Sequence, residues 1–290
     1  MECSSVTSDT TDKDLDALLR AAGLARLAPM LEHLAVSSLR LKTAAAAEEH
    51  LPLGASRLGG QPDLPAGAEW PHWNGAPLGF IGQLCLDDLG SSPVAQALPA
   101  PGRLYFFYDA RQKVYGDKPE DRGAWQVLYQ ADADDPLQRR PAPDGLPSQS
   151  RFRPCSVAYS VEQTLPQRPV LFEPRLDWTP DEQAKYEDFI FQHLSNRGWP
   201  RHRLWGHADE IQDDMHLQCQ LAAHGAHGIN DPRAAELAPG AMNWQLLLQV
   251  DTDQNTGMEW GNSGMLYYWI EKDALRARRF DNVWMALQSE

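Results

Sequence analysis

The sequence lacks the features that mark secreted, membrane-spanning or nucleic-acid-binding proteins. Its N-terminal segment, MECSSVTSDTTDKDLDALLR, contains neither the basic stretch nor the apolar run of a signal peptide. No stretch approaches the roughly 18 apolar residues that a membrane-spanning helix needs. Lys and Arg number only 26 against 40 Asp and Glu, and the net charge of −14 without any basic run disfavours binding to nucleic acid.

Cysteine is also scarce, and its spacing excludes two common structural devices. Cys3, Cys85, Cys155 and Cys219 are scattered singly, so the sequence predicts neither a disulfide framework nor a zinc site built on paired cysteines. Free thiols are typical of a reducing compartment, and we therefore expect a cytoplasmic protein.

Hydrophobic residues make up 42% and charged residues 23% of the 290 positions, which is ordinary for a globular protein. Residues 1–12 are polar and are expected to form a flexible N-terminus. Residues 13–290 are expected to form one domain.

The spacing of apolar residues predicts both helices and strands. A helical period from Leu15 to Leu34 predicts two short helices, and Thr179, Pro180 and Gly198 bound a longer helix. Strands are predicted at residues 37–43, 78–86, 102–108, 124–130, 156–164, 244–251 and 264–270. Residues 132–150 are expected to form an exposed loop. Because loops rather than helices join successive strands, the sheets should be antiparallel or mixed, which makes the fold class α+β.

The second half of the chain repeats the first in three places. RLGGQPD at 57–63 corresponds to RLWGHAD at 203–209, and GRLYFFYD at 102–109 corresponds to GMLYYWIE at 264–271. Between these motifs, an apolar strand in each half carries a glutamine, Gln83 or Gln249. Three matches in the same order predict internally duplicated mixed or antiparallel sheet units, at about 50–130 and 200–275, behind an N-terminal helical leader.

These motifs resemble the YwqG-like family of bacterial proteins. The resemblance rests on SRLGGQPDLP, EWP and PLGFIGQLCLDDL in the first half, and on HRLWGHADEIQDDM, LLLQVDTD and GMEWGNSGMLYYWI in the second. It implies a domain of unknown function with an α+β structure and no established reaction, and some members look like immunity proteins. The segment WGHADE departs from the family, whose members more often carry an aromatic residue and a proline after the glycine, which leaves a ligand contact there open.

Loop glycines, arginines and aromatic residues provide the candidate binding residues. Arginine offers a forked donor, tryptophan a flat apolar face and glycine a close approach of the backbone, and a buried glutamine needs a partner. The candidates are Arg57, Gly60, Trp70, Trp73, Gln83, Arg203, Gln249, Trp260 and Asn262. Two interpretations stay open for the arginines and glutamines: they reach a ligand between the repeats, or they hold the structure together, the arginines by bonding Asp63 and Asp209.

Two segments have spacings that resemble metal sites. Asp251, Asp253 and Asn255 alternate like the first ligands of a calcium loop, but the glycine and glutamate positions of an EF-hand are not matched, which favours a turn capped by these side chains. The other segment holds two pairs with a three-residue spacing that could bind zinc, His216 with Cys219 and His224 with His227. Solvated or packed histidines are the alternative for this segment, and no cofactor is expected.

No catalytic centre is recognisable in the sequence. Ser263 stands in GNSG rather than in the elbow motif of hydrolases, and the fingerprints of phosphate-binding and dinucleotide-binding loops are missing. We therefore expect a non-enzymatic protein-binding module, most concretely an immunity protein whose acidic charge suits a basic toxin. The alternative is an enzyme that binds a small molecule or metal between the repeats, with Arg57, Gln83, Arg203 and Gln249 converging on solvent.

Overall fold

The computed structural model describes residues 7–8, 15–109, 111–131 and 136–290. The expected flexible N-terminus over residues 1–12 therefore lies outside the described residues, except for β1 (Thr7–Ser8). The described chain combines helices with a large, mainly antiparallel sheet, which confirms the α+β fold class.

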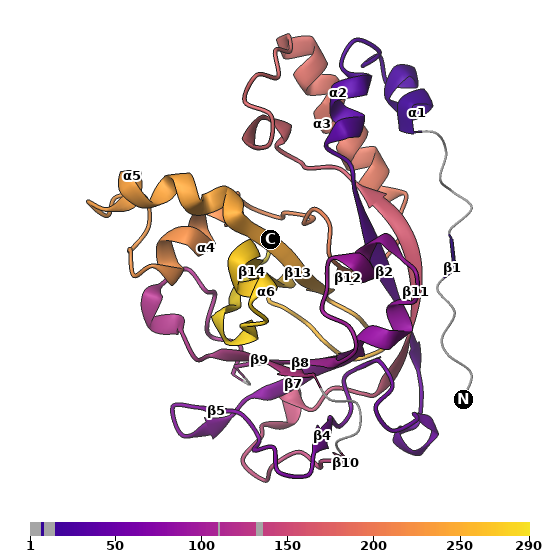
Figure 1. Cartoon of the computed structure of the whole chain (residues 1–290), viewed down its shortest axis with the longest axis vertical. Helices are drawn as coiled ribbons and strands as arrows, with labels where there is room; N and C mark the ends of the chain where they lie inside the picture. The colour runs from indigo at the N-terminus through magenta and orange to yellow at the C-terminus, as the bar shows by residue number, and fades with distance from the viewer. Residues whose placement is uncertain (1–6, 9–14, 110, 132–135) are drawn as a thin grey trace.

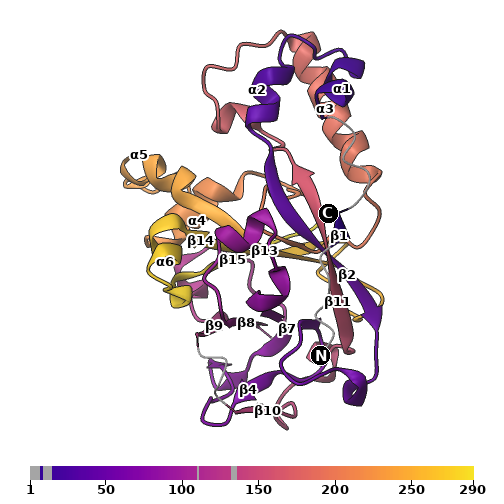
Figure 2. The same ribbon diagram turned by 45° about the vertical axis from the view of Figure 1, so that its right-hand side comes forward.

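Three helices gather at one end of the long axis of the molecule: α1 (Leu15–Ala21), α2 (Ala28–His33) and α3 (Pro180–Ser195) (Figures 1 and 2). They share a small core of their own, in which Leu19, Leu31, Tyr186 and Ile190 are buried. α3 begins as predicted, because the Thr179 hydroxyl accepts from the Glu182 amide while the Glu182 carboxylate accepts from the Thr179 amide.

Two long strands connect this helical end to the rest of the sheet. β2 (Val36–Ala45) and β11 (Cys155–Thr164) are antiparallel over their whole length, and they run from the helices through the middle of the sheet (Figure 2). β1 pairs with β11 in parallel, and the other pairs along the sheet are antiparallel within the described residues. β2 and β11 therefore lie between the two halves of the chain.

Each half adds strands to one side of this central pair. Beyond β11 lie β3 (Arg57–Leu58), β7 (Gly79–Cys85), β8 (Arg103–Tyr108) and β9 (Trp125–Gln130). Beyond β2 lie β12 (Arg203–Leu204), β13 (Trp244–Asp251), β14 (Met265–Glu271) and β15 (Trp284–Gln288). The strands predicted from apolar runs are found within one or two residues of their expected bounds, and β2 is longer than expected by one residue at its start and two at its end.

The two sides have the same register at corresponding positions. Arg57 lies opposite Gln83, which lies opposite Tyr105. In the other half, Arg203 lies opposite Gln249, which lies opposite Tyr267. The second strand of each side also contains a bulge, between Phe80 and Gly82 in β7 and between Leu246 and Leu248 in β13.

The connections carry the remaining elements. The short strands are β4 (Asp63–Pro65), β5 (His72–Trp73), β6 (Ala76–Pro77) and β10 (Leu137–Arg139). The short helices are α4 (Met215–Ala223), α5 (Ala234–Leu237) and α6 (Lys272–Arg276). The 3-10 helices are η1 (Glu48–His50), η2 (Leu86–Leu89), η3 (Pro93–Gln96), η4 (Pro119–Asp121), η5 (Ser148–Ser150), η6 (Pro169–Leu171), η7 (Ala238–Asn243) and η8 (Phe280–Asn282).

Two expectations about the connections are corrected. The stretch 132–150 is not only an exposed loop, because it contains β10, which pairs with β4. The polar region before β13 contains α4, which packs against the sheet with six of its nine residues buried. No helix in the described part of the chain has both the length and the apolar character needed to cross a membrane.

Candidate functional site

A fully buried arginine anchors a polar network in the first half of the chain. Arg57 Nη2 lies 2.8 Å from Asp63 Oδ2, and Arg57 Nη1 lies 2.7 Å from Glu48 Oε1. Gln83 accepts from the amide of Asp63 and donates both to the carbonyl of Ala55 and to the carboxylate of Asp63. Tyr105 donates to the carbonyl of Asp63 at 2.8 Å, and this closes the network.

The second half builds the same network from the corresponding residues. Arg203 Nη1 lies 2.7 Å from Asp209 Oδ1, and its Nε lies 2.6 Å from Glu162 Oε1. Gln249 accepts from the amide of Asp209 and donates to the carbonyl of Arg201 and to the Asp209 carboxylate. The hydroxyl of Tyr267 donates to the carbonyl of Asp209, as Tyr105 does to Asp63.

These two networks correct the expectation that Arg57, Gln83 and their counterparts in the second half converge on solvent. Arg57, Gln83, Arg203 and Gln249 have no exposed surface, and all four bond to protein groups. Arg57 and Arg203 bond the aspartates at the ends of their own motifs, Asp63 and Asp209.

The two networks differ in charge. The first half joins two arginines, Arg57 and Arg139, to two carboxylates. The second half joins four arginines to two carboxylates, an excess of two positive charges among the described residues. The members of this second set, which we call the arginine cluster, are Arg40, Arg197, Arg201, Arg203, Glu162 and Asp209.

A cavity of about 1000 Å³ lies beside the arginine cluster. Its walls come from β2, β11, α1 and the C-terminal part of α3, together with the loop that follows α3. The polar and charged residues that line it are Arg40, Lys42, Thr43, Glu162, Gln163, Gln192, His193, Asn196, Arg197 and Asn255. The apolar lining residues are Leu15, Leu18, Leu41, Val161, Phe189, Trp199 and Pro200.

Arg40 is the buried cation at this cavity. Its Nη2 donates to the carbonyls of Gly198 and Pro200 at 2.8 and 2.5 Å, which fastens the loop after α3 to β2. Its Nη1 has no hydrogen-bond acceptor, and the nearest carboxylate oxygen, from Glu162, is 3.8 Å away. Arg203 lies directly opposite on β12, so two like charges face each other across the strands. Burial, Arg203 and Arg201 lower the pKa of Arg40, while Glu162 and Asp209 oppose them.

Arg197 and His193 form the α3 side of the charged wall. Arg197 donates to the carbonyl of Gln163 and contacts the ring nitrogen of His193 at 2.5 Å. Burial and Arg203 lower the pKa of Arg197 to about 10, so it stays charged at neutral pH. Burial and Arg197 lower the pKa of His193 to about 4, so this ring is neutral there. The wall is therefore cationic through its arginines rather than through histidine.

The other candidate binding residues lie elsewhere. Trp70 is half-buried and donates to the carbonyl of Leu78, and Trp73 is half-buried in the β5–β6 hairpin. Trp260 is fully buried and donates to the carbonyl of Asp251, whereas Asn262 is exposed. None of these residues lines the cavity.

Gly60 occupies a position where the backbone conformation and the available space both favour glycine. Its φ of +71° lies in the left-handed region, and a Cβ there would come within 2.5 Å of Glu48 Oε2. Gly60 therefore lets its loop pack against the carboxylate that binds Arg57.

In the segment whose spacing resembles a calcium loop, both aspartates accept hydrogen bonds from protein groups. Asp253 Oδ1 accepts from the amide of Asn255 at 2.8 Å, and its Oδ2 accepts from the hydroxyl of Thr43 at 3.0 Å. Asp251 is buried and accepts from the amide of Arg201, and burial raises the pKa of its carboxyl group. Of the three residues, only Asn255 lines the cavity.

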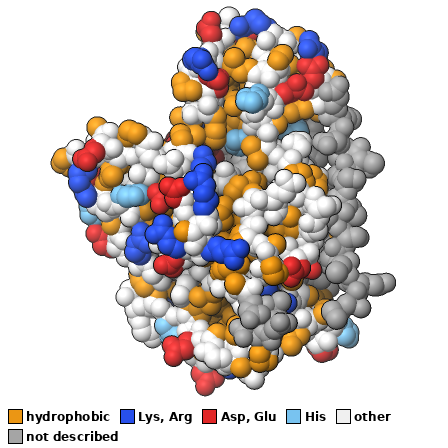
Figure 3. Space-filling view, viewed as in Figure 1, with side chains coloured by type: hydrophobic (Ala, Val, Ile, Leu, Met, Phe, Trp, Pro, Cys, Tyr) orange, Lys and Arg blue, Asp and Glu red, His pale blue; other side chains and the backbone are white. Residues whose placement is uncertain are grey.

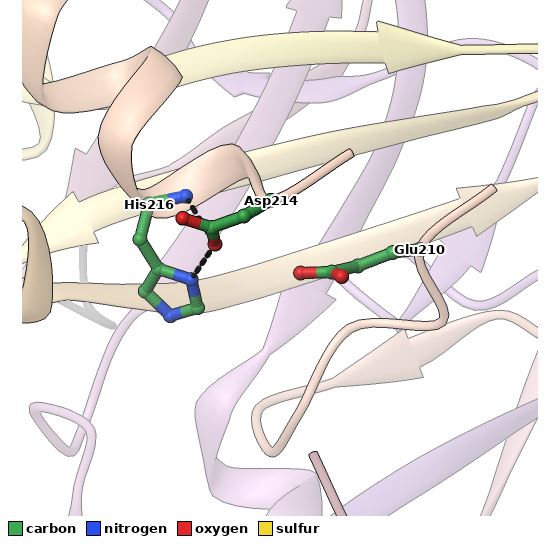
Figure 4. A group of neighbouring side chains, drawn as sticks. All are labelled: Glu210, Asp214 and His216. Carbon is green, nitrogen blue, oxygen red and sulfur yellow. Dashed lines mark hydrogen bonds and ion pairs between the residues drawn. The ribbon is translucent and has the colours of Figure 1, made fainter. Parts of the chain in front are cut away.

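The metal-ligating side chains that do come together are Glu210, Asp214 and His216, whose ligand atoms lie within 4.8 Å of one another (Figure 4). Asp214 already caps α4, because it accepts from the amides of His216 and Leu217, and it also bonds the His216 ring at 2.7 Å. Burial raises the pKa of Glu210 to about 8, even though Arg168 lies 2.7 Å away. Within the described residues, no such group includes Cys219, His224 or His227, whose spacing left a zinc site open.

Sequence reasoning missed Arg40 and Arg197, the two arginines that line the cavity. Arg40 sits in the alternating run SSLRLKT, where the period of two assigns it to the face opposite the apolar core. That pattern is equally typical of a solvated surface arginine. Only the fold reveals that α3, which begins 140 residues later in the chain, covers this face.

Comparison with known protein families assigns the chain to one of them. Residues 56–289 match the family described as a domain of unknown function, DUF1963, and the chain belongs to this family. No curated protein matches the chain.

Proposed function

We propose that the protein is a non-enzymatic binding protein that takes an anionic small molecule into the cavity beside its arginine cluster. The observation that carries this proposal is the charge difference between the two networks. Among the described residues, the first half balances two arginines with two carboxylates, whereas the second half leaves two arginines in excess beside the cavity. Since the first half shows that this framework can be neutral, the framework itself does not require the excess.

The excess is costly in the absence of an anion. The side chains of Arg40, Arg197 and Arg201 are only 8, 12 and 11% exposed, so water can compensate their charge only in part. Buried cations are normally paired, because an unpaired one loses its hydration without a partner. A carboxylate, sulfonate or phosphate group would supply the missing charge, and the guanidinium fork matches the geometry of these groups.

Titration with inorganic sulfate and phosphate tests this proposal. Wild type should bind either anion saturably in isothermal titration calorimetry, and the free energy of unfolding should rise by about 2.7 kcal/mol at one hundred times the dissociation constant. Arg197→Gln should weaken binding at least tenfold. Arg168→Gln is the matched control, because it removes an arginine that pairs with Glu210 outside the cavity lining.

Two results would count against anion binding in the cavity. One is a wild-type titration that shows no more heat than dilution. The other is equal stabilisation of wild type, Arg197→Gln and Arg168→Gln by sulfate, since sulfate stabilises folded proteins generally through exclusion from their surfaces.

A second part of the proposal concerns how the two similar halves of the chain arose. We propose that they are diverged copies of one unit, and that the YwqG-like resemblance describes the same family. The matched registers and matched networks around Arg57 and Arg203 support the duplication. In this view the cavity occupies the junction of the copies, because β2 and β11 lie between them.

A basic toxin is the second candidate partner, and the net charge of −14 favours it. Figure 3 shows Lys and Arg side chains gathered in the middle of one face, so this is not the face that we propose for a basic protein. A one-to-one complex with a toxin encoded nearby, lost as salt rises, would support immunity function. A neighbouring toxin that neither binds nor is neutralised would count against it.

We propose that binding needs no resident metal and takes place in the cytoplasm. Asp214 is committed to capping α4, and Glu210 lies against Arg168, which leaves these carboxylates less available to a cation. Cys85, Cys155 and Cys219 are free and buried, which suits a reducing compartment.

A further inference from the structure

We propose that the ligand is an amphipathic organic acid, with its anionic group at Arg40 and Arg197 and an apolar or aromatic body along the α1–α3 side of the cavity. This inference rests on the proposed function, because it requires that the cavity takes an anion. It goes further by assigning the body of the ligand as well as its charged group.

The size of the cavity favours an organic ligand over an inorganic anion. Its volume of about 1000 Å³ is that of sites for organic ligands, which range from about 300 to 1000 Å³. A sulfate or phosphate ion at Arg40 would leave most of this space to water. A ligand that fills the cavity must therefore extend well beyond its charged group.

The lining divides into a charged part and an apolar part. On β2, Arg40 and Lys42 are two residues apart and so project from the same face of the strand, and both line the cavity. On the helical side, Leu15, Leu18 and Phe189 line the cavity and are only partly buried. One molecule that contacts both parts needs an anionic end and an apolar end.

Trp199 provides the flat surface at the edge of this apolar part. It lines the cavity and is 65% exposed, which is unusual for a tryptophan. The guanidinium carbon of Arg201 lies 3.9 Å from the centre of a Trp199 ring, a cation–π contact that ties the indole to the arginine cluster. An aromatic or acyl body that packs on this indole would lie close to the charged group at Arg197.

Fluorescence titration with anilinonaphthalene sulfonate tests the inference, because this molecule joins a sulfonate to an aromatic body. Sulfate represents the charged group alone, and neutral phenylnaphthylamine represents the body alone. The sulfonate should bind one-to-one and at least tenfold more tightly than sulfate or phenylnaphthylamine. This difference corresponds to about 1.4 kcal/mol of binding free energy. A long-chain fatty acid and an aryl phosphate, added as competitors, distinguish a carboxylate from a phosphate group and an acyl from an aromatic body.

Two pairs of variants locate the binding. Trp199→Ser should weaken anilinonaphthalene sulfonate at least tenfold but leave sulfate unchanged, whereas Phe191→Ser, an exposed α3 residue outside the lining, should change neither. Arg197→Gln should weaken both ligands, and Arg168→Gln should weaken neither. Circular dichroism and urea midpoints establish that each variant is folded before its binding is compared.

The outcomes separate the two proposals. Sulfate binding that depends on Arg197, with anilinonaphthalene sulfonate no tighter or insensitive to Trp199→Ser, would overturn the amphipathic ligand and leave the anion site standing. Binding of the sulfonate that is no tighter than that of phenylnaphthylamine and is unaffected by Arg197→Gln, together with no Arg197-dependent binding of sulfate, would overturn both. Tight sulfonate binding that needs both Trp199 and Arg197 supports both.

Discussion

Replacement of the two corresponding glutamines by leucine tests whether the two polar networks hold the fold together. Gln83→Leu and Gln249→Leu keep the approximate size and shape of the side chain but remove its amide group. Each glutamine is fully buried and makes the same three bonds, at 2.7, 2.9 and 3.1 Å for Gln83 and at 2.9, 2.8 and 3.1 Å for Gln249.

The expected loss follows from the groups left behind. In Gln83→Leu, the amide of Asp63 and the carbonyl of Ala55 lose the partners that the glutamine gives them. Each unsatisfied buried group costs about 1–3 kcal/mol, so the free energy of unfolding should fall by roughly 2–6 kcal/mol. Gln249→Leu should cost about the same, through the amide of Asp209 and the carbonyl of Arg201. Since whole domains are stable by only about 5–15 kcal/mol, this loss is easily measured.

Urea unfolding followed by circular dichroism measures both variants. The midpoint should fall while the slope of free energy against urea stays constant, because the surface exposed on unfolding is unchanged. Gln126→Leu is the control, since its side chain is exposed on β9 and its replacement should cost less than about 0.5 kcal/mol. A loss below about 1 kcal/mol at Gln83 or Gln249, or tolerance of one but not of the other, would refute the equivalence of the networks.

Two further predictions concern groups outside the networks. The pKa of Glu210 is about 8 in the folded protein, well above its ordinary 4.5, so the folded state retains a proton that the unfolded state has lost, and stability should fall as pH rises from about 4.5 to 8. Glu210→Gln should therefore match wild type near pH 4 and exceed its stability by up to about 5 kcal/mol near pH 9. Urea unfolding at both pH values measures this difference, and equal stability at pH 9 would contradict the raised pKa. Thr179→Ala removes the N-cap of α3 and should cost about 1 kcal/mol, whereas Thr179→Asn should restore most of it; an unchanged thermal midpoint in Thr179→Ala would show that the capping box contributes little.

The elements that sequence reasoning predicted well are those specified by local chemistry. α3 follows from a threonine cap, a proline at the first helical position and a glycine stop, all of which act within a few residues. The strands β7, β8, β13 and β14 follow from apolar runs too short for helices. The repeated motifs around Arg57 and Arg203 were likewise visible, because the arginine and the aspartate of each network stand at the two ends of a similar seven-residue motif.

The elements that sequence reasoning missed depend on contacts between distant parts of the chain. α4 has no polar face to reveal a helical period, because it is enclosed by the sheet and by η7. The arginine cluster joins β2, β11, β12 and the end of α3, and Arg40 is 157 residues away from Arg197. Single arginines in amphipathic segments are common, and nothing in their local sequence distinguishes a surface residue from one beneath a cavity.

The position of the excess charge is the strongest argument that it serves a ligand. Like charges directly opposite on neighbouring strands are destabilising, yet Arg40 and Arg203 occupy such a pair across β2 and β12. Glu162 bridges them, with Arg203 Nε at 2.6 Å, but this carboxylate also lies 3.9 Å from Arg197 and cannot neutralise three cations. Proteins tend to retain such local conflicts where function needs them, and here the conflict adjoins a large cavity rather than the closed core. An anion that binds there stabilises the fold and satisfies the cluster by the same contacts, so the gain in stability produced by a fixed concentration of anion should rise and fall with affinity across variants of Arg197.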